Sequence, residues 1–526
     1  TTLQTNARML SYQDYAQKLK KNGLTHINTT LFSHDEKTHQ AITQTKNSWQ
    51  QTVEGIKNAQ KNNIKAKVTV PILPQNFALL AQTIQFLIGL KVKQAVLNHA
   101  FACSNQINLL PYSRSMPFVH KCFDFENLID VSIEGIAPCT LGSAIDHFAW
   151  KFKEMDGFEK IDCCKNCKFL LSCSGIPVEY LKKFSKKEFR PVKDKFEHLK
   201  IEVTPGCNAD CYFCYNKNTF AKNSRPKGQL STIQVKRALE KAAKAGVSFV
   251  QFTGGEPLLR EDLFELTQYA KDLGIYASVN TNTLLLNAEK AGKIQRHADE
   301  IAVSLHSVKA IDSNKHYSKA HLLKKKSLLK TLREGGVAVG ANTIADAENI
   351  ENLDEFHKTV GEIGFDFWHI LRPFPPFGKQ ITNKDFGMLI EKLIRFREGG
   401  SRTTTIKYSF PFCAYDPFKV AEVSSSYVCN LNSTSLVLSP SGVVRSSIEF
   451  DFALGNVFED SFEECWNNKY VKGIQNLEFL PKTCIKCRFV GVCRGGSRHA
   501  TNTISKGLLK LDPLAQPEKY KKILFS

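Results

Sequence analysis

One order of strand-like and helix-like segments occurs twice along the 526 residues of this chain. Three pairs of apolar segments correspond in sequence order: Leu3–Leu10 with Val279–Leu286, His26–Leu31 with Glu300–Leu305, and Ala66–Leu73 with Gly336–Thr343. Charged stretches with a helical pattern separate the segments of each set. Strands that alternate with helices in this way are typical of parallel β/α units. We therefore predict an α/β fold.

A cysteine-rich tail follows each of the two runs. The shared landmarks are Cys122-x12-Gly135 with Cys429-x12-Gly442, and Cys164-x2-Cys167-x5-Cys173 with Cys484-x2-Cys487-x5-Cys493. Agreement of several landmarks in one order is hard to attribute to chance. The sequence therefore predicts an internal duplication.

The two copies differ in completeness. The second has a front end with a three-cysteine loop, a helix near Ser231–Gly246 and the segment Phe249–Pro257. The first starts where the fourth β/α unit of the second would lie. Half of a parallel barrel exposes two sheet edges and part of its core, so it gains little stability alone. We expect residues 1–102 to be the rear half of a barrel whose front is missing from the sequence. A fragment of a longer protein is the favoured explanation, and docking of the half-barrel elsewhere is the alternative.

The predicted domains follow this order. Residues 1–102 form the first, truncated barrel, 103–183 the first cysteine-rich region, 184–197 a linker, 198–380 the core barrel and 381–526 the second cysteine-rich region. The linker contains the highly charged stretch Phe184–Lys195.

The front of the second copy holds Cys207, Cys211 and Cys214, directly after the apolar-alternating segment Leu199–Thr204. Their C-x3-C-x2-C spacing does not fit one face of a regular helix, but it suits a loop around a compact inorganic centre. Three thiolates leave one iron of a four-iron cluster without a protein ligand. An open metal position is what a catalytic centre requires. A zinc loop or a chance cluster is the alternative interpretation.

The net charge and the cysteines limit the partners and the cellular compartment that we expect for this chain. The net charge of +20, from 71 Lys and Arg against 51 Asp and Glu, favours an anionic partner such as nucleic acid, an acidic peptide or a polycarboxylate. Solvated lysines on helix faces would give the same excess. The longest apolar run, Phe77–Leu90, is interrupted by Gln and falls short of a membrane span of about 20 residues. Sixteen cysteines in C-x2-C-type groups, with no export signal, predict metal ligation in the reducing cytoplasm.

The cysteine loop, the segment Gly254–Pro257 and the β/α alternation together resemble the radical S-adenosylmethionine (radical SAM) superfamily. The cysteine-rich tail resembles the SPASM/twitch auxiliary-cluster extension of that superfamily. The resemblance covers residues 198–500 directly and residues 1–180 through the duplication. It implies a partial (β/α) barrel with its chemistry at the carboxyl ends of the strands.

The resemblance also assigns roles to residues of the second copy. The three cysteines of the loop would hold a [4Fe–4S] cluster whose open iron binds S-adenosylmethionine (SAM). The implied SAM-binding residues are Phe213 and Arg372 at the adenine, Gly254, Gly255, Glu256 and Pro257 at the methionine, and Ser304 with Asn282 at the ribose. The alternatives are a plain strand-to-helix turn at Gly254–Pro257, structural hydroxyls, and a surface ion pair for Arg372. No general acid or base can be assigned.

The second cysteine-rich tail departs from a complete SPASM pattern, because Ser447 and Ser497 occupy two cysteine positions and no cysteine follows Cys493. It therefore predicts one auxiliary cluster. The expected ligands are Cys484, Cys487, Cys493 and, as the fourth, Cys429, or instead Cys413 or His499. The candidate ligands in the first tail are Cys122, Cys139, Cys164, Cys167 and Cys173. A structural zinc site is the alternative for both sets.

The family resemblance implies reductive cleavage of SAM to a 5′-deoxyadenosyl radical that abstracts hydrogen from a substrate at the barrel mouth. Because auxiliary clusters in this superfamily often serve peptide substrates, we expect a peptide or protein side chain as substrate. A flavodoxin or ferredoxin would supply electrons. The alternatives are a tetrapyrrole or other small anionic substrate, RNA modification, and a non-catalytic iron–sulfur electron carrier. The sequence has no RNA-binding motif beyond its basic charge, and a carrier needs neither an open three-cysteine site nor Gly254–Glu256.

Overall fold

The computed structural model describes residues 1–99, 110–126, 128–149, 156–170, 172–216, 228–308, 318–373, 379–399, 404–407, 410–423, 434–448 and 452–525. The chain divides into two compact units. Unit 1 comprises Thr1–Lys193 with Leu393–Thr403, and unit 2 comprises Asp194–Lys392 with Thr404–Ser526. The change of unit after Lys193 falls within the charged stretch 184–197. None of the helices in these described ranges is both long and apolar enough to cross a membrane.

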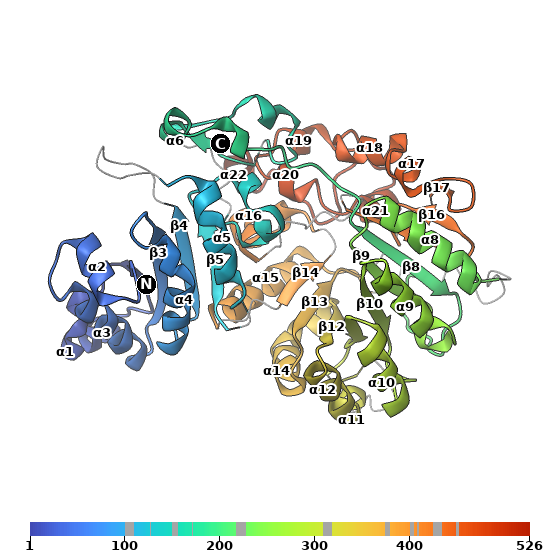
Figure 1. The fold of residues 1–526 in the computed structure, drawn as a ribbon, viewed down its shortest axis with the longest axis horizontal. Coiled ribbons are helices and arrows are strands. Elements are labelled where there is room, and N and C mark those ends of the chain that lie inside the picture. Colours follow the sequence, from blue (N-terminus) through green and yellow to red (C-terminus); the bar gives the residue numbers. More distant parts are fainter. Residues whose placement is uncertain are drawn as a thin grey trace. The chain divides into compact units, whose positions relative to one another are not determined.

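Five parallel strands form the main sheet of unit 1 (Figure 1). Their order across the sheet follows the sequence: β1 (Thr2–Gln4), β2 (His26–Thr30), β3 (Lys65–Ile72), β4 (Gln94–His99) and β5 (Asp130–Glu134). The helices between them are α1 (Gln13–Lys21), α2 (Glu36–Thr43), α3 (Ser48–Lys61), α4 (Leu80–Gly89) and α5 (Tyr112–Phe123). A short antiparallel pair, β6 (Phe158–Glu159) and β7 (Ile176–Pro177), and α6 (Val178–Lys183) follow in the cysteine-rich part.

A ten-stranded sheet runs through unit 2 in the order β14-β13-β12-β11-β10-β9-β8-β15-β16-β17. The parallel strands are β8 (His198–Thr204), β9 (Phe249–Gly254), β10 (Tyr276–Thr281), β11 (Glu300–Ser304), β12 (Ala338–Ile344), β13 (Phe367–Leu371), β14 (Thr404–Lys407) and β15 (Ser435–Leu438). Two antiparallel strands, β16 (Val443–Arg445) and β17 (Ala453–Asn456), complete it. The sheet therefore continues past residue 380, where we expected the core to end, because β14 and β15 pair with its two sides.

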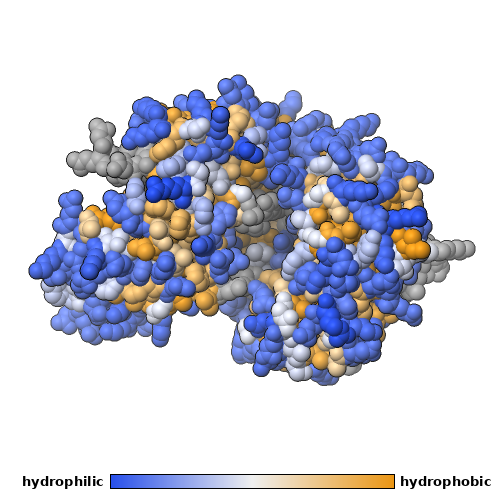
Figure 2. Space-filling view, viewed as in Figure 1, coloured by the Kyte–Doolittle hydropathy of each residue, from blue (hydrophilic) through white to orange (hydrophobic). Residues whose placement is uncertain are grey.

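The helices of unit 2 fall into two groups. Those between the parallel strands are α8 (Thr232–Lys244), α9 (Leu263–Asp272), α10 (Ala288–His297), α11 (Lys319–Lys324), α12 (Lys326–Glu334), α13 (Ala347–Glu351), α14 (Leu353–Ile363) and α15 (Asn383–Glu398), the last of which extends into the residues grouped with unit 1. The later ones are α16 (Pro417–Val423), α17 (Phe462–Trp466), α18 (Lys469–Gln475), α19 (Lys482–Ile485), α20 (Val490–Cys493), α21 (Arg498–Ile504) and α22 (Lys521–Leu524). Hydrophilic residues make up most of the surface on the face shown in Figure 2, with apolar residues between them.

Strand β8 and helix α8 illustrate how the sequence builds this layer. Apolar residues alternate along β8, and all three of them, Leu199, Ile201 and Val203, are buried. Helix α8 begins with a capping box, in which Ser231 and Gln234 exchange side-chain-to-backbone hydrogen bonds. The buried residues of α8 recur at helical spacing, as Val235, Ala238, Leu239 and Ala242. Helices α8, α9 and α10 then pack side by side along the strands (Figure 1).

The five strands of unit 1 correspond to β10–β14 of unit 2, and the turn after the first strand repeats in detail. In the turn Thr5–Arg8, the Ala7 amide donates to the Thr5 hydroxyl and the Arg8 amide donates to the side-chain carbonyl of Asn6, both at 3.1 Å. In Thr281–Leu284 the same two bonds measure 3.0 and 2.9 Å. The third residue of each turn has a positive φ, 59° in Ala7 and 62° in Thr283. The duplication thus extends to individual hydrogen bonds.

A second repeated contact lies beyond the next two strands of each unit. An asparagine amide bridges two backbone carbonyls: Asn76 donates to Phe32 and Pro71 at 2.6 and 2.7 Å, and Asn349 to His306 and Ile344 at 3.1 and 2.8 Å. Unit 1 therefore has counterparts of β10–β14 and of the contacts that hold their carboxyl ends together.

Candidate functional site

The three-cysteine loop follows β8 directly in unit 2. Cys207, Cys211 and Cys214 are each partly buried, and the Cys214 amide donates to the Cys211 carbonyl at 3.2 Å. Burial raises the pKa of the Cys207 thiol above its ordinary value. A partly buried thiol of this kind becomes a stable thiolate when a metal supplies compensating positive charge.

Gly254 and Gly255 bring the end of β9 against the start of the loop. Gly254 has a φ of 126°, and a Cβ there would lie 2.5 Å from the Thr204 carbonyl oxygen. A Cβ on Gly255 would lie 1.9 Å from the Gly206 carbonyl oxygen. The amides of Gly255 and Glu256 donate to those same two carbonyls, each at 2.8 Å. Both glycines are thus required by close approach of backbone to backbone.

The side chain of Glu256 fastens β9 to β10. It is 1% exposed and accepts hydrogen bonds from the Thr281 hydroxyl (2.6 Å), the Asn282 amide (2.8 Å) and the Leu258 amide (3.0 Å). Burial raises the pKa of this carboxyl, and the three donors oppose the rise. Pro257 begins the short helical turn that follows. The carboxylate is therefore largely occupied within the protein, and its expected bond to the SAM ammonium stays a prediction.

Asn282 extends this link to the cysteine loop. Its Nδ2 donates to Asn208 Oδ1 at 2.8 Å and lies 4.0 Å from Cys207 Sγ. On the other side of the loop, Asn216 Nδ2 donates to the Gly254 carbonyl at 3.0 Å. Sequence reasoning missed Asn208 and Asn216, since an asparagine beside a cysteine motif carries no signal of its partner.

Phe213 lies at the carboxyl ends of β12 and β13. It is buried against Ile344, and Cys211 and Leu371 pack on the same cluster. Its ring also makes an edge contact with His306, at 4.7 Å between ring centroids. Ser304 ends β11, beside the same strand ends, and is partly buried. The loop, β9 and these strand ends therefore converge at one edge of the parallel sheet, where α/β folds hold their ligands.

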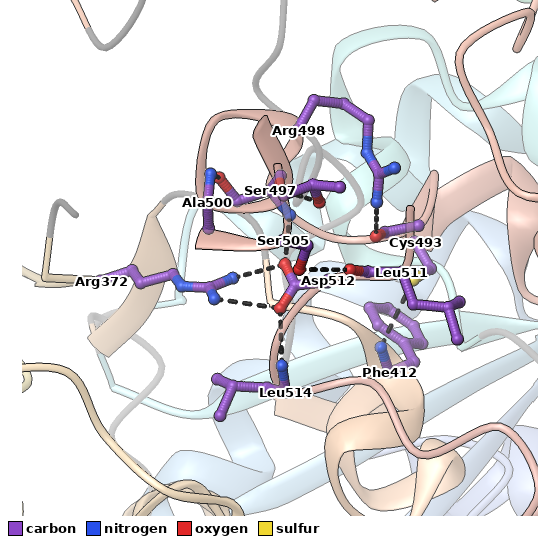
Figure 3. Close-up of polar contacts among 12 residues, drawn as sticks. Arg372, Phe412, Cys493, Ser497, Arg498, Ala500, Ser505, Leu511, Asp512 and Leu514 are labelled. Carbon is purple, nitrogen blue, oxygen red and sulfur yellow. Dashed lines mark hydrogen bonds and ion pairs between the residues drawn. The ribbon is translucent and has the colours of Figure 1, made fainter. Parts of the chain in front are cut away.

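Arg372 follows β13 and is only 5% exposed. Its guanidinium forms a bidentate ion pair with Asp512, at 2.7 and 3.0 Å (Figure 3). The guanidinium also lies over the Phe410 ring. The same carboxylate accepts from the amides of Ser497 (2.8 Å) and Leu514 (3.0 Å). The alternative interpretation of Arg372 was a surface ion pair, and the pair that the structure shows is buried. The predicted contact of Arg372 with the SAM adenine stays a prediction. It joins the end of β13 to the C-terminal cysteine-rich segment.

Four cysteines line a cavity in that C-terminal segment: Cys413, Cys484, Cys487 and Cys493, together with Phe412 and Phe489. The Phe412 amide donates to Cys493 Sγ at 3.3 Å (Figure 3). Burial raises the pKa of Cys413 to about 12 and that of Cys487 to about 11. His499 is not among the lining residues, and Cys429 lies outside the described residues.

A similar cavity occurs in unit 1. Its cysteines are Cys139, Cys163, Cys164, Cys167 and Cys173. The Gly175 amide donates to Cys173 Sγ at 3.3 Å, and burial raises the pKa of Cys139 to about 12. Cys122 does not line this cavity, because it lies within α5 and its thiol bonds to the Phe118 carbonyl at 3.3 Å. Cys163, which was not among the candidate ligands predicted from the sequence, also lines it.

In each unit, one cavity-lining cysteine lies outside the C-x2-C-x5-C group, and it comes from the same position in the fold. Cys139 lies in a helical turn five residues after Glu134, the end of β5, and Cys413 in a helical turn six residues after Lys407, the end of β14. The sequence spacing had instead paired Cys122 with Cys429. In the described ranges no three His, Cys, Asp or Glu side chains form a single-ion group. The thiols line each cavity together with an amide donor to sulfur, an arrangement that fits a four-thiolate iron–sulfur cluster.

Comparison with known proteins finds one family and several relatives that resemble this chain. Residues 1–87 and 201–361 match the family described as Radical SAM superfamily. The chain is 24% identical to Fe-coproporphyrin III synthase of Methanosarcina barkeri over 61% of this chain and 88% of that protein. It is 23% identical to PqqA peptide cyclase of Gluconobacter oxydans over 61% and 91% of the two chains.

Among solved structures, Streptococcus suis SuiB bound to S-adenosylmethionine matches with a TM-score of 0.50, at 19% identity, over 61% of this chain and 78% of that one. This likeness concerns the fold. Radical SAM proteins use a [4Fe–4S] cluster and SAM, and relatives with SPASM-type tails carry auxiliary clusters. Two stretches of this chain, residues 1–87 and 201–361, are thus radical SAM sequence, and the second contains the three-cysteine loop.

Proposed function

We propose that the chain is an enzyme that cleaves SAM reductively and abstracts hydrogen from a peptide or protein side chain. The observation that carries the proposal is the convergence of the three-cysteine loop with Gly254–Glu256 and Asn282 at the carboxyl ends of the strands. When bound, the cluster and SAM supply a 5′-deoxyadenosyl radical that takes a hydrogen atom from the substrate.

The residues of the chain bind and orient these groups. Cys207, Cys211 and Cys214 would hold three irons and leave the fourth open to SAM. The chain of bonds from Glu256 through Asn282 to Asn208 fixes the loop relative to β9 and β10. A loop held in this way keeps the open position aligned with the strand ends, where reaction requires fixed distances.

The side chains near the loop would shape the SAM site. Phe213, packed against Ile344, gives an apolar wall suited to an adenine ring and excludes water from it. The Ser304 hydroxyl at the end of β11 is suited to a ribose hydroxyl. We assign Arg372 to holding the C-terminal segment through Asp512 instead of to SAM, because both groups of the pair are buried.

The two cysteine-lined cavities are proposed to hold auxiliary clusters. The ligands in unit 2 would be Cys413, Cys484, Cys487 and Cys493, and those in unit 1 Cys139, Cys164, Cys167 and Cys173. A flavodoxin or ferredoxin would donate the electrons that reach the centres. The amides that point at Cys493 and Cys173 would stabilise the negative charge on cluster thiolates.

The similarity to PqqA peptide cyclase supports a peptide substrate, and the net charge of +20 suits an acidic one. The similarity to Fe-coproporphyrin III synthase supports a second candidate, a tetrapyrrole carboxylate. Both candidates share the SAM chemistry and differ in the substrate alone, so one assay with two substrate panels separates them.

The assay is anaerobic reconstitution with iron, sulfide, dithionite and SAM, followed by measurement of 5′-deoxyadenosine. We expect the reconstituted protein to form it and the Cys211→Ala variant to form none. Cys465→Ala, a buried cysteine outside all three cysteine groups, is the matched control and should retain activity. Substrate-dependent product from acidic peptides supports the first candidate, and product from coproporphyrins alone supports the second. If the intact protein forms no 5′-deoxyadenosine with either panel, the proposed function is wrong.

A further inference from the structure

Three polar side chains lie together on the face of the unit 2 sheet that points away from the helices. Trp368 marks the helix-covered face, since its ring stacks on Phe356 of α14 with 6.2 Å between the ring centroids. The next residue, His369, therefore lies on the opposite face. Asn342 pairs with His369 in register and donates to Asn280 Oδ1 at 3.1 Å. We call Asn280, Asn342 and His369 the polar row, and each of them is partly exposed.

The polar row lies next to the strand ends where the SAM site is expected. Asn342 pairs in register with Ser304, the residue predicted to contact the ribose. His369 comes two residues before Leu371, which packs with Phe213. Two residues of a strand span about 7 Å. A substrate group that contacts the row is therefore close to the reacting centre of the proposed function, on which this inference rests.

Two lysines act on the polar row. Among the described residues, Lys200 of β8 and Lys407 of β14 are the charged groups within electrostatic range of His369. Burial is the main reason why the pKa of the His369 imidazole lies well below its ordinary value, and the two lysines lower it further. His369 is therefore neutral near pH 7 and carries one ring N–H.

The reach of these lysines shows that the sheet is curved around the row. Five strands lie between β8 and β14 in the sheet order. Lys407 pairs in register with Leu371, which lies on the same face as His369. Lys200 reaches the same histidine from the other side only because the sheet curves towards itself. The polar row thus lies on the concave face, with one lysine on each side.

The carboxylates on this face are engaged with other groups. Glu202 forms a buried ion pair with Arg445, and Glu300 accepts from the Ser278 hydroxyl at 2.7 Å. Burial raises the pKa of both carboxyls, although each lies within range of one of the two lysines. Among the described residues, neither carboxylate is one of the charges that act on His369. The electrostatic field at the row is therefore positive and favours an anion.

We propose that the polar row, Lys200 and Lys407 form the substrate-binding site of this chain and bind a carboxylate of the substrate. The two ammonium groups pair with the carboxylate, and the ring N–H of His369 and the asparagine amides donate hydrogen bonds to it. The carbon chain that carries the carboxylate then extends towards the strand ends. An acidic side chain of a peptide and a propionate of a tetrapyrrole both offer this group.

The test is isothermal titration calorimetry of the anaerobically reconstituted full chain in the presence of SAM. The probes are the acetylated and amidated peptide Ala-Glu-Ala-Glu-Ala with its glutamine counterpart, and coproporphyrin III with its tetra-amide. We expect a carboxylate probe to bind at least tenfold more tightly than its neutral counterpart, which lacks the charge-assisted hydrogen bonds. Lys200→Met and Lys407→Met should each weaken binding of that probe roughly tenfold, whereas Lys407→Arg should keep most of the affinity. Lys330→Met, which removes an exposed lysine of α12, is the matched control.

Three results overturn the proposal. One is the absence of saturable binding by either carboxylate probe, and another is equal affinity for the carboxylate probes and their neutral counterparts. The third is binding by folded Lys200→Met and Lys407→Met proteins that equals binding by Lys330→Met, with folding established by circular dichroism. Binding of the peptide alone assigns the carboxylate to an acidic side chain, and binding of the porphyrin alone assigns it to a propionate.

Formation of 5′-deoxyadenosine in the same samples separates this inference from the proposed function. If 5′-deoxyadenosine forms and one of the three results is found, the binding site is wrong and the radical chemistry stands. If a carboxylate probe binds as expected and no 5′-deoxyadenosine forms, the binding site stands and the proposed function is wrong.

Discussion

The buried ion pair between Arg372 and Asp512 allows a quantitative test of how the C-terminal segment is held. Both side chains are almost fully buried, and the carboxylate accepts two bonds from the guanidinium and two from backbone amides. Arg372→Met leaves a buried negative charge with the two amides alone. Removal of one partner from a buried pair costs about 3–5 kcal/mol, so we expect a loss of that size in the free energy of unfolding.

The double variant Arg372→Met, Asp512→Asn distinguishes the charge from the packing. The Asn side-chain oxygen can still accept from the amides of Ser497 and Leu514, and no buried charge remains. The double variant should therefore be more stable than Arg372→Met by about 1–3 kcal/mol.

The assay is urea-induced unfolding of the anaerobically reconstituted protein, followed by circular dichroism and by iron release. Lys236→Met is the matched control, because Lys236 pairs with Glu265 at the surface and its loss should cost no more than about 1 kcal/mol. If the losses of Arg372→Met and Asp512→Asn simply add in the double variant, the two charges do not depend on each other and the reasoning is refuted.

Three further predictions follow from the geometry. Cys413→Ala and Cys139→Ala should each reduce the reconstituted iron content by about four atoms per chain, whereas Cys122→Ala and Cys429→Ala should not; equal losses in all four would refute the ligand assignment. Gly255→Ala should abolish cluster incorporation at the three-cysteine loop, because its Cβ would meet the Gly206 carbonyl; electron paramagnetic resonance tests this. Gly361 in α14 has open space around it, so Gly361→Ala should raise the free energy of unfolding by about 0.4–1 kcal/mol, measured by urea unfolding. Burial lowers the pKa of His39 to about 4 from an unfolded value near 6.5, so its contribution to stability is complete above pH 6.5 and is lost, by up to about 3 kcal/mol, as the pH falls towards 4. In His39→Gln the urea midpoint of unit 1 should lose that part of its pH dependence, and an unchanged profile would contradict the assignment.

The β/α order, the duplication and the three-cysteine loop could be predicted because each is a pattern local to the sequence. The partners of the site residues could not. Asp512 lies 140 residues from Arg372, and nothing near either residue in the sequence indicates a bidentate pair. The three donors to Glu256 come from its own turn and from β10, so its buried role depends on how two strand ends meet.

The fourth cysteines show a different limit of sequence reasoning. The C-x12-G spacing paired Cys122 with Cys429, whereas Cys139 and Cys413, which line the two cavities, correspond when positions are counted from the end of a strand. Cys139 and Cys413 are set by β5 and β14, whose positions follow from the packing of the sheet and not from cysteine spacing. Distances counted from secondary-structure ends are therefore more informative here than distances counted between like residues.

The shared position of Cys139 and Cys413 also bears on the history of the chain. Each cysteine lies in the helical turn beyond the last parallel strand of its five-strand set, β5 in unit 1 and β14 in unit 2. A position shared in this way indicates that both units inherited the cysteine from one ancestral unit. The strand order and the cysteine-lined cavity beyond it were therefore copied together.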